Sequence, residues 1–260
     1  MDQGRLTKKE RHALILSEVR RSASIRISKL ARRIGVAGET IRRDLIELGD
    51  AGLINRTYGG ATISLVTSEP VISERGLTLI EERARIGRGA ASLVEKGQIV
   101  MIDGGSTTYE VARNLSQLKR DLTIITNSTG VASVAGANPT FRVLLCPGTY
   151  DSREGSVLGE DTVEFLRRYN ADVAIIGASG ISADGPSDMI SGAAAVKRAM
   201  ISRSLSTVLV VTHDKFGRSS LERICGLDDI ADIVTDSEPK ADLRTAAEQA
   251  GTELHVFAAD

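Results

Sequence analysis

The chain has 260 residues, of which 42% are hydrophobic and 26% charged, and its formal net charge is −1. This length is enough for one or two domains with buried cores, and the charge excludes a histone-like or polybasic protein. The total conceals a division, because residues 1–62 carry 13 Lys and Arg against 7 Asp and Glu, and the rest of the chain carries 20 against 27. The basic first part favours binding to a polyanion.

Several other classes are disfavoured. Cys146 and Cys225 lie far apart and neither is part of a CxxC, so we expect no metal site and no disulfide framework. No apolar run approaches the roughly 18 residues of a membrane span. The N-terminal stretch lacks an apolar segment followed by a small-residue cleavage site, so we expect a cytoplasmic protein.

The first 62 residues predict a helix, a helix–turn–helix and a two-stranded wing. Thr7 and Glu10 form a capping-box pattern ahead of a helix at 8–21. We assign its buried stripe to Ala13, Leu14, Leu16 and Val19. Ser28 is the expected cap of a short helix that ends at Ile34, and a second helix follows at 39–51. Two short strands then flank Gly59-Gly60.

The remainder predicts a linker at 63–76 and an α/β domain at 77–260. After a helix at 77–95, apolar strands alternate with helices, which indicates a parallel sheet covered on both faces. The expected strands are 98–103, 122–126, 141–146, 172–177, 206–212, 231–235 and 253–257. The expected helices are 107–116, 129–136, 160–169, 193–203 and 240–250.

The second helix of the helix–turn–helix has a polar and basic face. If Ile41, Leu45 and Leu48 face the core, Thr40 and Arg43 share the opposite side. Arginine can bind guanine bidentately in the major groove, and other basic residues hold phosphates. The candidate DNA-binding residues are Lys29, Arg32, Arg33, Thr40, Arg42, Arg43 and Arg56. The alternative is a solvated basic face of a small helical subdomain.

The stretch TIRRDLIELGDAGLINRTYGGA (Thr40–Ala61) resembles the winged helix–turn–helix of the DeoR family of bacterial transcriptional regulators. The chain departs from the family pattern at Gly38, where the family usually has Ser.

A second constellation follows the predicted strands. The loop Asp103-Gly104-Gly105-Ser106-Thr107-Thr108 opens a helix whose N-terminal N–H groups suit a phosphate. Carboxyl ends of parallel strands meet at one edge, where ligands bind. Asn127-Ser128 and His213-Asp214-Lys215 end two further strands. The alternative is an ordinary loop with a hydroxyl-capped helix.

This part resembles the DeoR sensor domain, which itself resembles ribose-5-phosphate isomerases, with DGGSTT, TNS, VKRAM and KFG standing at the family positions. The run Ser152–Ile181 looks most like the glycerol-3-phosphate-responsive repressors. The resemblance implies an effector site for a phosphorylated sugar or polyol lined by Asp103, Gly104, Gly105, Ser106, Thr107, Thr108, Asn127, Ser128, Lys197 and Lys215. Arg153 is either an additional phosphate ligand or a surface arginine.

The alternative function is a sugar-phosphate isomerase-like enzyme fused to a DNA-binding domain. Such isomerases carry a paired-acid DGAD loop, and the corresponding stretch here, GASGISADG, lacks the pair. Asp184 precedes Gly185, which is typical of a turn, and His213-Asp214 is the remaining acid–base candidate.

We therefore expect a winged helix–turn–helix joined to a Rossmann-like parallel α/β sensor domain. The expected protein is a non-enzymatic repressor without a cofactor. Its expected partners are double-stranded operator DNA, a phosphorylated effector, and further copies of itself in a homodimer or homotetramer.

Overall fold

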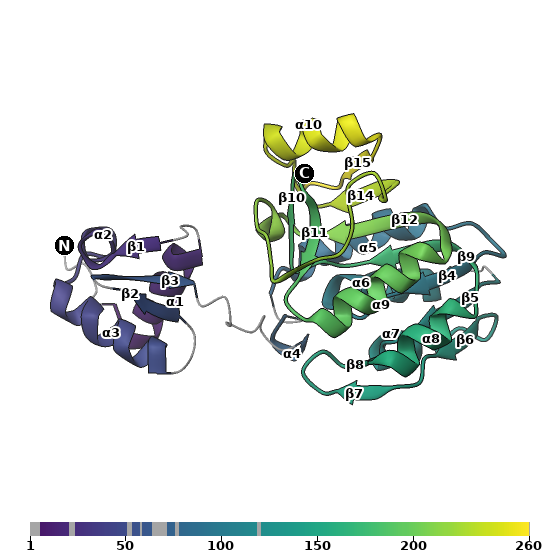
Figure 1. Cartoon of the computed structure of the whole chain (residues 1–260), viewed down its shortest axis with the longest axis horizontal. Helices are drawn as coiled ribbons and strands as arrows, with labels where there is room; N and C mark the ends of the chain where they lie inside the picture. Colours follow the sequence, from purple (N-terminus) through teal and green to yellow (C-terminus); the bar gives the residue numbers. More distant parts are fainter. Residues whose placement is uncertain are drawn as a thin grey trace. The chain divides into compact units, whose positions relative to one another are not determined.

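The computed structural model divides into two compact units, Met1–Glu69 (the N-terminal unit) and Pro70–Asp260 (the C-terminal unit). It describes residues 6–20, 24–50, 54–57, 59–63, 72–75, 78–118 and 121–259, some of them by backbone alone (Figure 1). Most of the predicted linker at 63–76 lies outside these residues. Within the described ranges, no helix is long and apolar enough to cross a membrane.

The N-terminal unit is a winged helix–turn–helix. Its helices are α1 (Lys8–Arg20), α2 (Ile27–Ile34) and α3 (Gly38–Asp50). Its antiparallel sheet has the order β1-β3-β2, formed by Ser24–Arg26, Gly60–Ile63 and Ile54–Thr57. The hairpin β2–β3 was predicted, whereas β1 was not. Gly35 adopts a φ of 75° and ends α2, which makes the turn into α3.

One small core holds these helices together. Its buried residues are Ile15, Val19, Ile25, Leu30, Ile41, Leu45, Leu48 and Ile54. The predicted stripe of α1 was wrong at Leu14, which is 42% exposed, while Ile15 is fully buried. Ile15 and Val19 stand four residues apart and therefore share one helix face. The side chain of Ala13 lies outside the described residues.

The ends of two helices test the capping predictions. Thr7 and Glu10 form the predicted capping box, in which the Thr7 N–H donates to Glu10 (2.8 Å) and the Glu10 N–H donates to Thr7 Oγ1 (3.3 Å). Ser28 does not cap α2, because the helix begins one residue earlier and Arg26 precedes it without a side-chain cap.

The C-terminal unit is built on a seven-stranded parallel sheet with the order β15-β14-β12-β9-β4-β5-β6. All seven predicted strands are present. They are β4 (Ile99–Ile102), β5 (Thr123–Thr126), β6 (Arg142–Leu145), β9 (Ala171–Ile176), β12 (Ser204–Val211), β14 (Asp232–Thr235) and β15 (Glu253–Val256).

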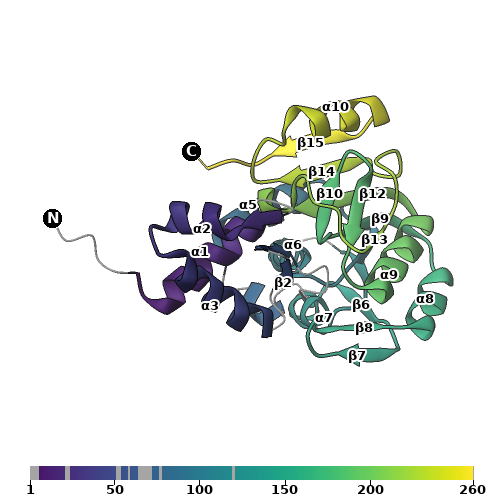
Figure 2. The ribbon, with the colours of Figure 1, turned by 60° about the vertical axis from the view of Figure 1, so that its left-hand side comes forward.

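Helices cover both faces of this sheet, as its apolar strands require. On one face lie α5 (Ile80–Ser92), α6 (Ser106–Ser116) and α7 (Thr129–Gly136), packed against Val100 and Ile102. On the other lie α8 (Glu160–Arg167), α9 (Ser191–Ser202) and α10 (Ala241–Ala250). Figures 1 and 2 both show α10 beside β15.

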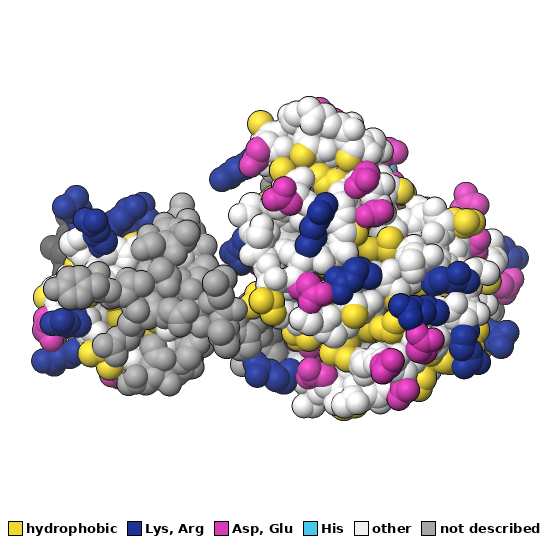
Figure 3. Space-filling view, in the orientation of Figure 1, with side chains coloured by type: hydrophobic (Ala, Val, Ile, Leu, Met, Phe, Trp, Pro, Cys, Tyr) yellow, Lys and Arg dark blue, Asp and Glu magenta, His cyan; other side chains and the backbone are white. Residues whose placement is uncertain are grey.

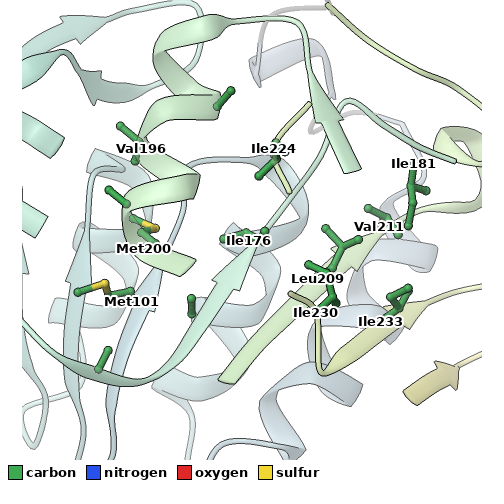
Figure 4. Close-up of a cluster of buried hydrophobic side chains, with 14 of the residues drawn as sticks. Met101, Ile176, Ile181, Val196, Met200, Leu209, Val211, Ile224, Ile230 and Ile233 are labelled. Carbon is green, nitrogen blue, oxygen red and sulfur yellow. The ribbon is translucent and has the colours of Figure 1, made fainter. Parts of the chain in front are cut away.

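Each face of the sheet has its own hydrophobic core. Figure 4 shows the core beneath α9, where Met101, Ile176 and Leu209 of the sheet lie on the same side as Val196 and Met200 of α9. Successive strand residues point to opposite faces, so Met101 enters this core while its neighbours enter the other.

Several short elements were not predicted. They are α4 (Ile72–Arg75), the hairpin β7 (Thr149–Asp151) and β8 (Ser156–Leu158), a 3-10 turn at His213–Lys215, and a small sheet of β10 (Gly180–Ser182), β11 (Gly185–Asp188) and β13 (Glu222–Arg223). Asp184 stands in the tight turn between β10 and β11, as expected of a turn residue.

Candidate functional site

Helix α3 presents a basic face to solvent because its apolar side is buried in the core. Ile41 is 0% exposed and Leu45 2% exposed, whereas the side chain of Arg43 is 78% exposed. Arg42 is also exposed and Thr40 is half-buried. The predicted division of α3 into a core side and an outward side is confirmed.

Helix α2 adds further charge at the surface. Lys29, Arg32 and Arg33 are exposed, and Arg33 is paired with Glu18 of α1. Arg43 lies 3.9 Å from Glu39, a solvent-exposed pair of little energetic weight. Lys and Arg side chains stand out on the described part of this unit in Figure 3. Arg56 lies in β2, and its side chain is outside the described residues.

Asp44 of α3 has a role that the sequence analysis missed. It is 2% exposed and receives hydrogen bonds from Arg11 Nη2 (2.9 Å) and His12 Nε2 (3.1 Å) of α1. Burial raises the pKa of Asp44, but the hydrogen bonds from Arg11 and then His12 outweigh burial and hold the pKa below its ordinary value. This ionic contact fixes α3, and hence its basic face, on α1.

In the C-terminal unit, the predicted effector residues gather at the carboxyl edge of the sheet. The loop 103–108 follows β4 and opens α6, and Asn127-Ser128 follows β5 and opens α7. A Cβ on Gly104 would lie 2.9 Å from Ser156 Cβ, so only glycine allows this loop to approach β8 so closely. The Ser128 Oγ accepts a hydrogen bond from the Val131 N–H (3.3 Å) and caps α7.

Lys197 and Asp103 are brought together, together with a residue that was not predicted. The Lys197 Nζ lies 2.9 Å from Asp103 Oδ2 and 2.9 Å from Asp188 Oδ2. All three residues are buried. Asp188 comes from β11, an element without a clear sequence signal. This buried triad therefore joins the loop after β4, the small sheet and α9.

The triad keeps its lysine charged. Burial lowers the pKa of Lys197, but attraction to Asp103 and then Asp188 outweighs burial, and the pKa lies above the ordinary lysine value. Burial raises the pKa of the Asp103 carboxyl in spite of Lys197. The ammonium of Lys197 is paired with two carboxylates. Lys197 therefore acts chiefly by holding the loop around Asp103 in place.

Asn127 is buried beside this loop. Its Nδ2 donates to the Val157 carbonyl (3.1 Å), and its backbone oxygen accepts from the Val157 N–H (2.7 Å). Its Oδ1 is buried and has no hydrogen-bond partner among the described residues. An unpaired buried acceptor is costly, and a ligand hydroxyl is one group that can satisfy it.

Two further predicted residues, Arg153 and Lys215, make other contacts. Arg153 is exposed, and it is its backbone oxygen that accepts a bond from the Ile72 N–H (2.9 Å). Lys215 is half-buried, with its Nζ 3.9 Å from Asp214.

The carboxylate beside His213 is not Asp214. His213 Nδ1 lies 2.5 Å from Asp236 Oδ2, and Asp214 instead accepts a bond from Thr212. The adjacent pair is therefore not an acid–base couple. Burial raises the pKa of both Cys146 and Cys225 to about 12, so neither offers a thiolate at neutral pH.

A cavity of about 390 Å³ lies where α6 and α7 begin. Of the predicted residues, Ser106 and Ser128 line it, and Thr129 and Gly130 continue the α7 side. Its other described lining residues are Ile72, Ile80, Arg83, Tyr109, Glu110 and Gly155. Arg83 was missed, although a basic residue on the buried face of a helix, three before Ile86, is a signal that the sequence carries.

Two family models match the chain. Residues 11–65 match the DeoR-like helix-turn-helix domain, and residues 78–237 match the DeoR C terminal sensor domain.

Curated relatives align along nearly the whole chain. The glycerol-3-phosphate regulon repressor of Escherichia coli is 33% identical over 231 residues, which cover 88% of this chain and 91% of that protein. The HTH-type transcriptional repressor GlcR of Bacillus subtilis is 31% identical over 252 residues, 96% of this chain and 97% of that protein.

The matches to solved structures are more distant. Ribose 5-phosphate isomerase A from Methanocaldococcus jannaschii is 15% identical, with a TM-score of 0.41 over 54% of this chain and 55% of that chain. The tetrameric eIF2B-beta2-delta2 complex from C. thermophilum contains a chain that is 12% identical, with a TM-score of 0.49 over 95% of this chain and 90% of that chain.

Proposed function

Because this chain belongs to the DeoR family of transcriptional regulators, we propose that it represses an operon for sugar or polyol catabolism and is released from its operator by a phosphorylated sugar or polyol. The observation that carries the proposal is α3, which buries Ile41 and Leu45 while Arg42 and Arg43 face solvent. A short basic helix face held on a rigid core is what insertion into the major groove requires.

In this proposal residues 1–62 bind the operator, 63–76 form the linker, and 77–260 bind the effector and form a homodimer or homotetramer in the cytoplasm. Arg42 and Arg43 contact DNA bases. The DNA phosphates are contacted by Lys29, Arg32, Arg33, Thr40 and Arg56.

The effector site is the carboxyl edge of the sheet. The phosphate binds at the N-termini of α6 and α7, to the loop Gly104–Thr108 and to Ser128. The position of Ser106 and Ser128 in the wall of the cavity supports this assignment. The Asn127 Oδ1 accepts a hydrogen bond from a hydroxyl of the ligand. Lys215 and Arg153 add positive charge to the effector site. Asp103 and Lys197 act by fixing the loop.

The proposed protein is not an enzyme. Isomerisation needs a base beside the substrate carbon and a group that polarises the carbonyl. Asp184 is exposed in a turn, and Asp103 is occupied by Lys197. Turnover of ribose 5-phosphate by the full chain would overturn this part.

The test selects operator DNA from a randomised pool and then screens phosphorylated sugars and polyols by thermal shift. A ligand of the native state stabilises it by RT ln(1 + [L]/Kd). A stabilising compound is expected to release the selected DNA, with Lys215→Ala binding DNA normally and responding poorly. Failure to select any DNA sequence, or normal release from the variant, would contradict the proposal.

A further inference from the structure

We propose that Asp232, Glu253 and His255, at the outer edge of the parallel sheet, bind a divalent metal ion of the zinc class. The site lies on β14 and β15, and none of the candidate DNA-binding or effector residues belongs to it. The inference is therefore independent of the proposed function. The cysteine pattern, which disfavoured a metal site, does not bear on this cluster, because none of its ligands is a cysteine.

The register of the two outermost strands places the three side chains on one face of the sheet. β15 is an end strand of the sheet (Figure 1), and Asp232 of β14 stands opposite Glu253 of β15. Paired residues of parallel strands point to the same side, and so does His255, two residues after Glu253. Val234 points to this side as well and enters the core that α5 shares. The backbone therefore gathers the three polar side chains beside that core.

The three donor atoms converge. The His255 Nε2 lies 2.7 Å from Asp232 Oδ1 and 3.9 Å from Glu253 Oε1, and all three atoms lie within 4.8 Å of one another. Ligand atoms at about 2.0–2.2 Å from a zinc ion are separated by roughly 3–3.5 Å, so small side-chain rotations bring these atoms to bonding positions. The side chains of Asp232 and His255 are 21% and 22% exposed, whereas that of Glu253 is 74% exposed and can rotate.

The two carboxylates lack a basic partner among the described residues. Their ion pairs in this part of the chain are both with His255. Arg85 of the neighbouring α5 instead donates to the Phe257 oxygen (3.0 Å). Like charges on paired strands repel each other, and a divalent cation between them removes the repulsion.

The first histidine of the chain shows what a compensated cluster looks like. The Nε2 of His12 lies 3.1 Å from Asp44 Oδ1 and 3.8 Å from Glu47 Oε2, which resembles the arrangement around His255. In that cluster, however, Arg11 pairs with Asp44 and Lys8 pairs with Glu47. The negative charge is already balanced there, so a metal ion would have to displace two cations.

The second histidine has too few donors. His213 pairs with a single carboxylate within the described ranges, that of Asp236, through its Nδ1. Of the three histidines in the sequence, His255 is thus the one that meets two carboxylates without a competing lysine or arginine in the part of the chain that the structure describes.

The donor set selects the class of metal. Imidazole suits zinc, nickel and copper, whereas Ca²⁺ and Mg²⁺ prefer oxygen ligands alone. A carboxylate can only accept a hydrogen bond, so the Nε2 of His255 carries its proton toward Asp232. To coordinate a metal, the neutral imidazole carries that proton on Nδ1 and offers the Nε2 lone pair. Water fills the remaining positions, and the ion joins the end strand to its neighbour.

The test uses the full chain, freed of any affinity tag and treated with EDTA, with ZnCl₂ as the probe. Calorimetry is expected to show one Zn²⁺ per chain, and Zn²⁺ should raise the unfolding temperature because it binds the folded state. Glu253→Gln should weaken binding at least about tenfold. Asp232→Asn and His255→Ala should weaken it at least as much. Glu253→His, which supplies another zinc ligand at the same place, should restore it.

Matched controls separate a built site from general attraction to an acidic surface. Glu248→Gln removes the same charge from an exposed position on α10, and His213→Ala removes another histidine. Both should bind Zn²⁺ as the wild type does. CaCl₂ as a second probe should bind at least about tenfold more weakly than ZnCl₂. Circular dichroism in EDTA shows whether each variant is folded. If His255→Ala is not, the two variants of the exposed Glu253 decide.

Four results would overturn the inference. They are absence of Zn²⁺ binding to the wild type, unchanged binding by Glu253→Gln, equal affinity for Zn²⁺ and Ca²⁺, and a Glu253→His variant that binds no better than Glu253→Gln. None of them affects the proposed binding of DNA or of a phosphorylated effector.

Discussion

In the proposed function, the two units bind an anion in opposite ways. In the N-terminal unit the basic side chains of α2 and α3 are exposed and rest on an apolar core. In the C-terminal unit the charges near the candidate effector site are buried and compensated, as Lys197 is by Asp103 and Asp188. An extended polyanion is met by surface charge, whose effect weakens with salt. In the proposal, a small ligand binds to N–H groups at helix N-termini in the wall of a cavity.

The difference explains why net charge is informative for one unit and misleading for the other. Residues 1–62 carry an excess of basic residues, and the rest of the chain an excess of acidic ones. If the acidic unit binds an anion as proposed, it does so only locally, through helix N-termini and a few cationic side chains. Four predictions test this contrast, beginning with the largest expected effect.

Lys197→Met should lower the free energy of unfolding by about 3–5 kcal/mol, because it leaves two buried carboxylates without their cation. Urea unfolding followed by circular dichroism measures the change. The control is Lys96→Met, since Lys96 pairs with Asp121 at 3.3 Å with both side chains largely exposed, and should cost less than about 1 kcal/mol. Equal losses would contradict the buried-triad account.

Asp44→Asn should cost about 1.5–3 kcal/mol, because charge-assisted bonds to Arg11 and His12 are lost. The pKa of Asp44 is lowered in the folded state, so its contribution is fully present above the unfolded pKa of about 3.9 and is lost as pH falls through the folded value. The free energy of unfolding of the variant should therefore fall less steeply with decreasing pH than that of the wild type. Glu39→Gln, at an exposed pair, should leave the pH profile of unfolding unchanged.

Arg43→Ala should weaken binding to the selected operator by about ten- to a hundredfold, the value of one bidentate base contact. Stability and effector binding should not change, because the side chain is 78% exposed. Fluorescence anisotropy measures the affinity, with Arg167→Ala, an exposed arginine of α8, as control. Equal loss of operator and effector binding would refute the division of roles between the units.

Thr7→Ala should cost about 1 kcal/mol, the usual value of an N-cap. The side-chain and then the backbone hydrogen bond with Thr7 lower the pKa of Glu10, so the variant should return that pKa toward its ordinary value. An NMR titration of Glu10 measures it. An unchanged pKa would show that the capping box does not persist in solution.

The regular helices and strands were predictable because the spacing of their apolar residues indicates which side chains are buried. Seven apolar runs of strand length became the seven parallel strands. The periodicity of Ile41, Leu45 and Leu48 placed α3 correctly. Leu14 and Ile15 were confused because two adjacent apolar residues fit one helical stripe almost equally well, and only packing against α2 and α3 distinguishes them.

The short elements were not predictable in the same way. Strand β1 has three residues, too few for a pattern, and it forms because β3 offers it an edge. The small sheet β10-β11-β13 joins segments about 40 residues apart. Its pairing depends on contacts that no local pattern records.

The sequence alone determined the order of the domains, the basic face of α3 and the loop that opens α6, because these depend on local periodicity and on residues adjacent in the chain. Only the tertiary structure decided which charges meet. The fold brings Asp44 to Arg11, Lys197 between Asp103 and Asp188, and His213 to Asp236. Each of these contacts joins separate segments of the chain. Burial makes an unpaired charge costly, so each of these buried carboxylates needs a cation, but the fold decides which cation it meets.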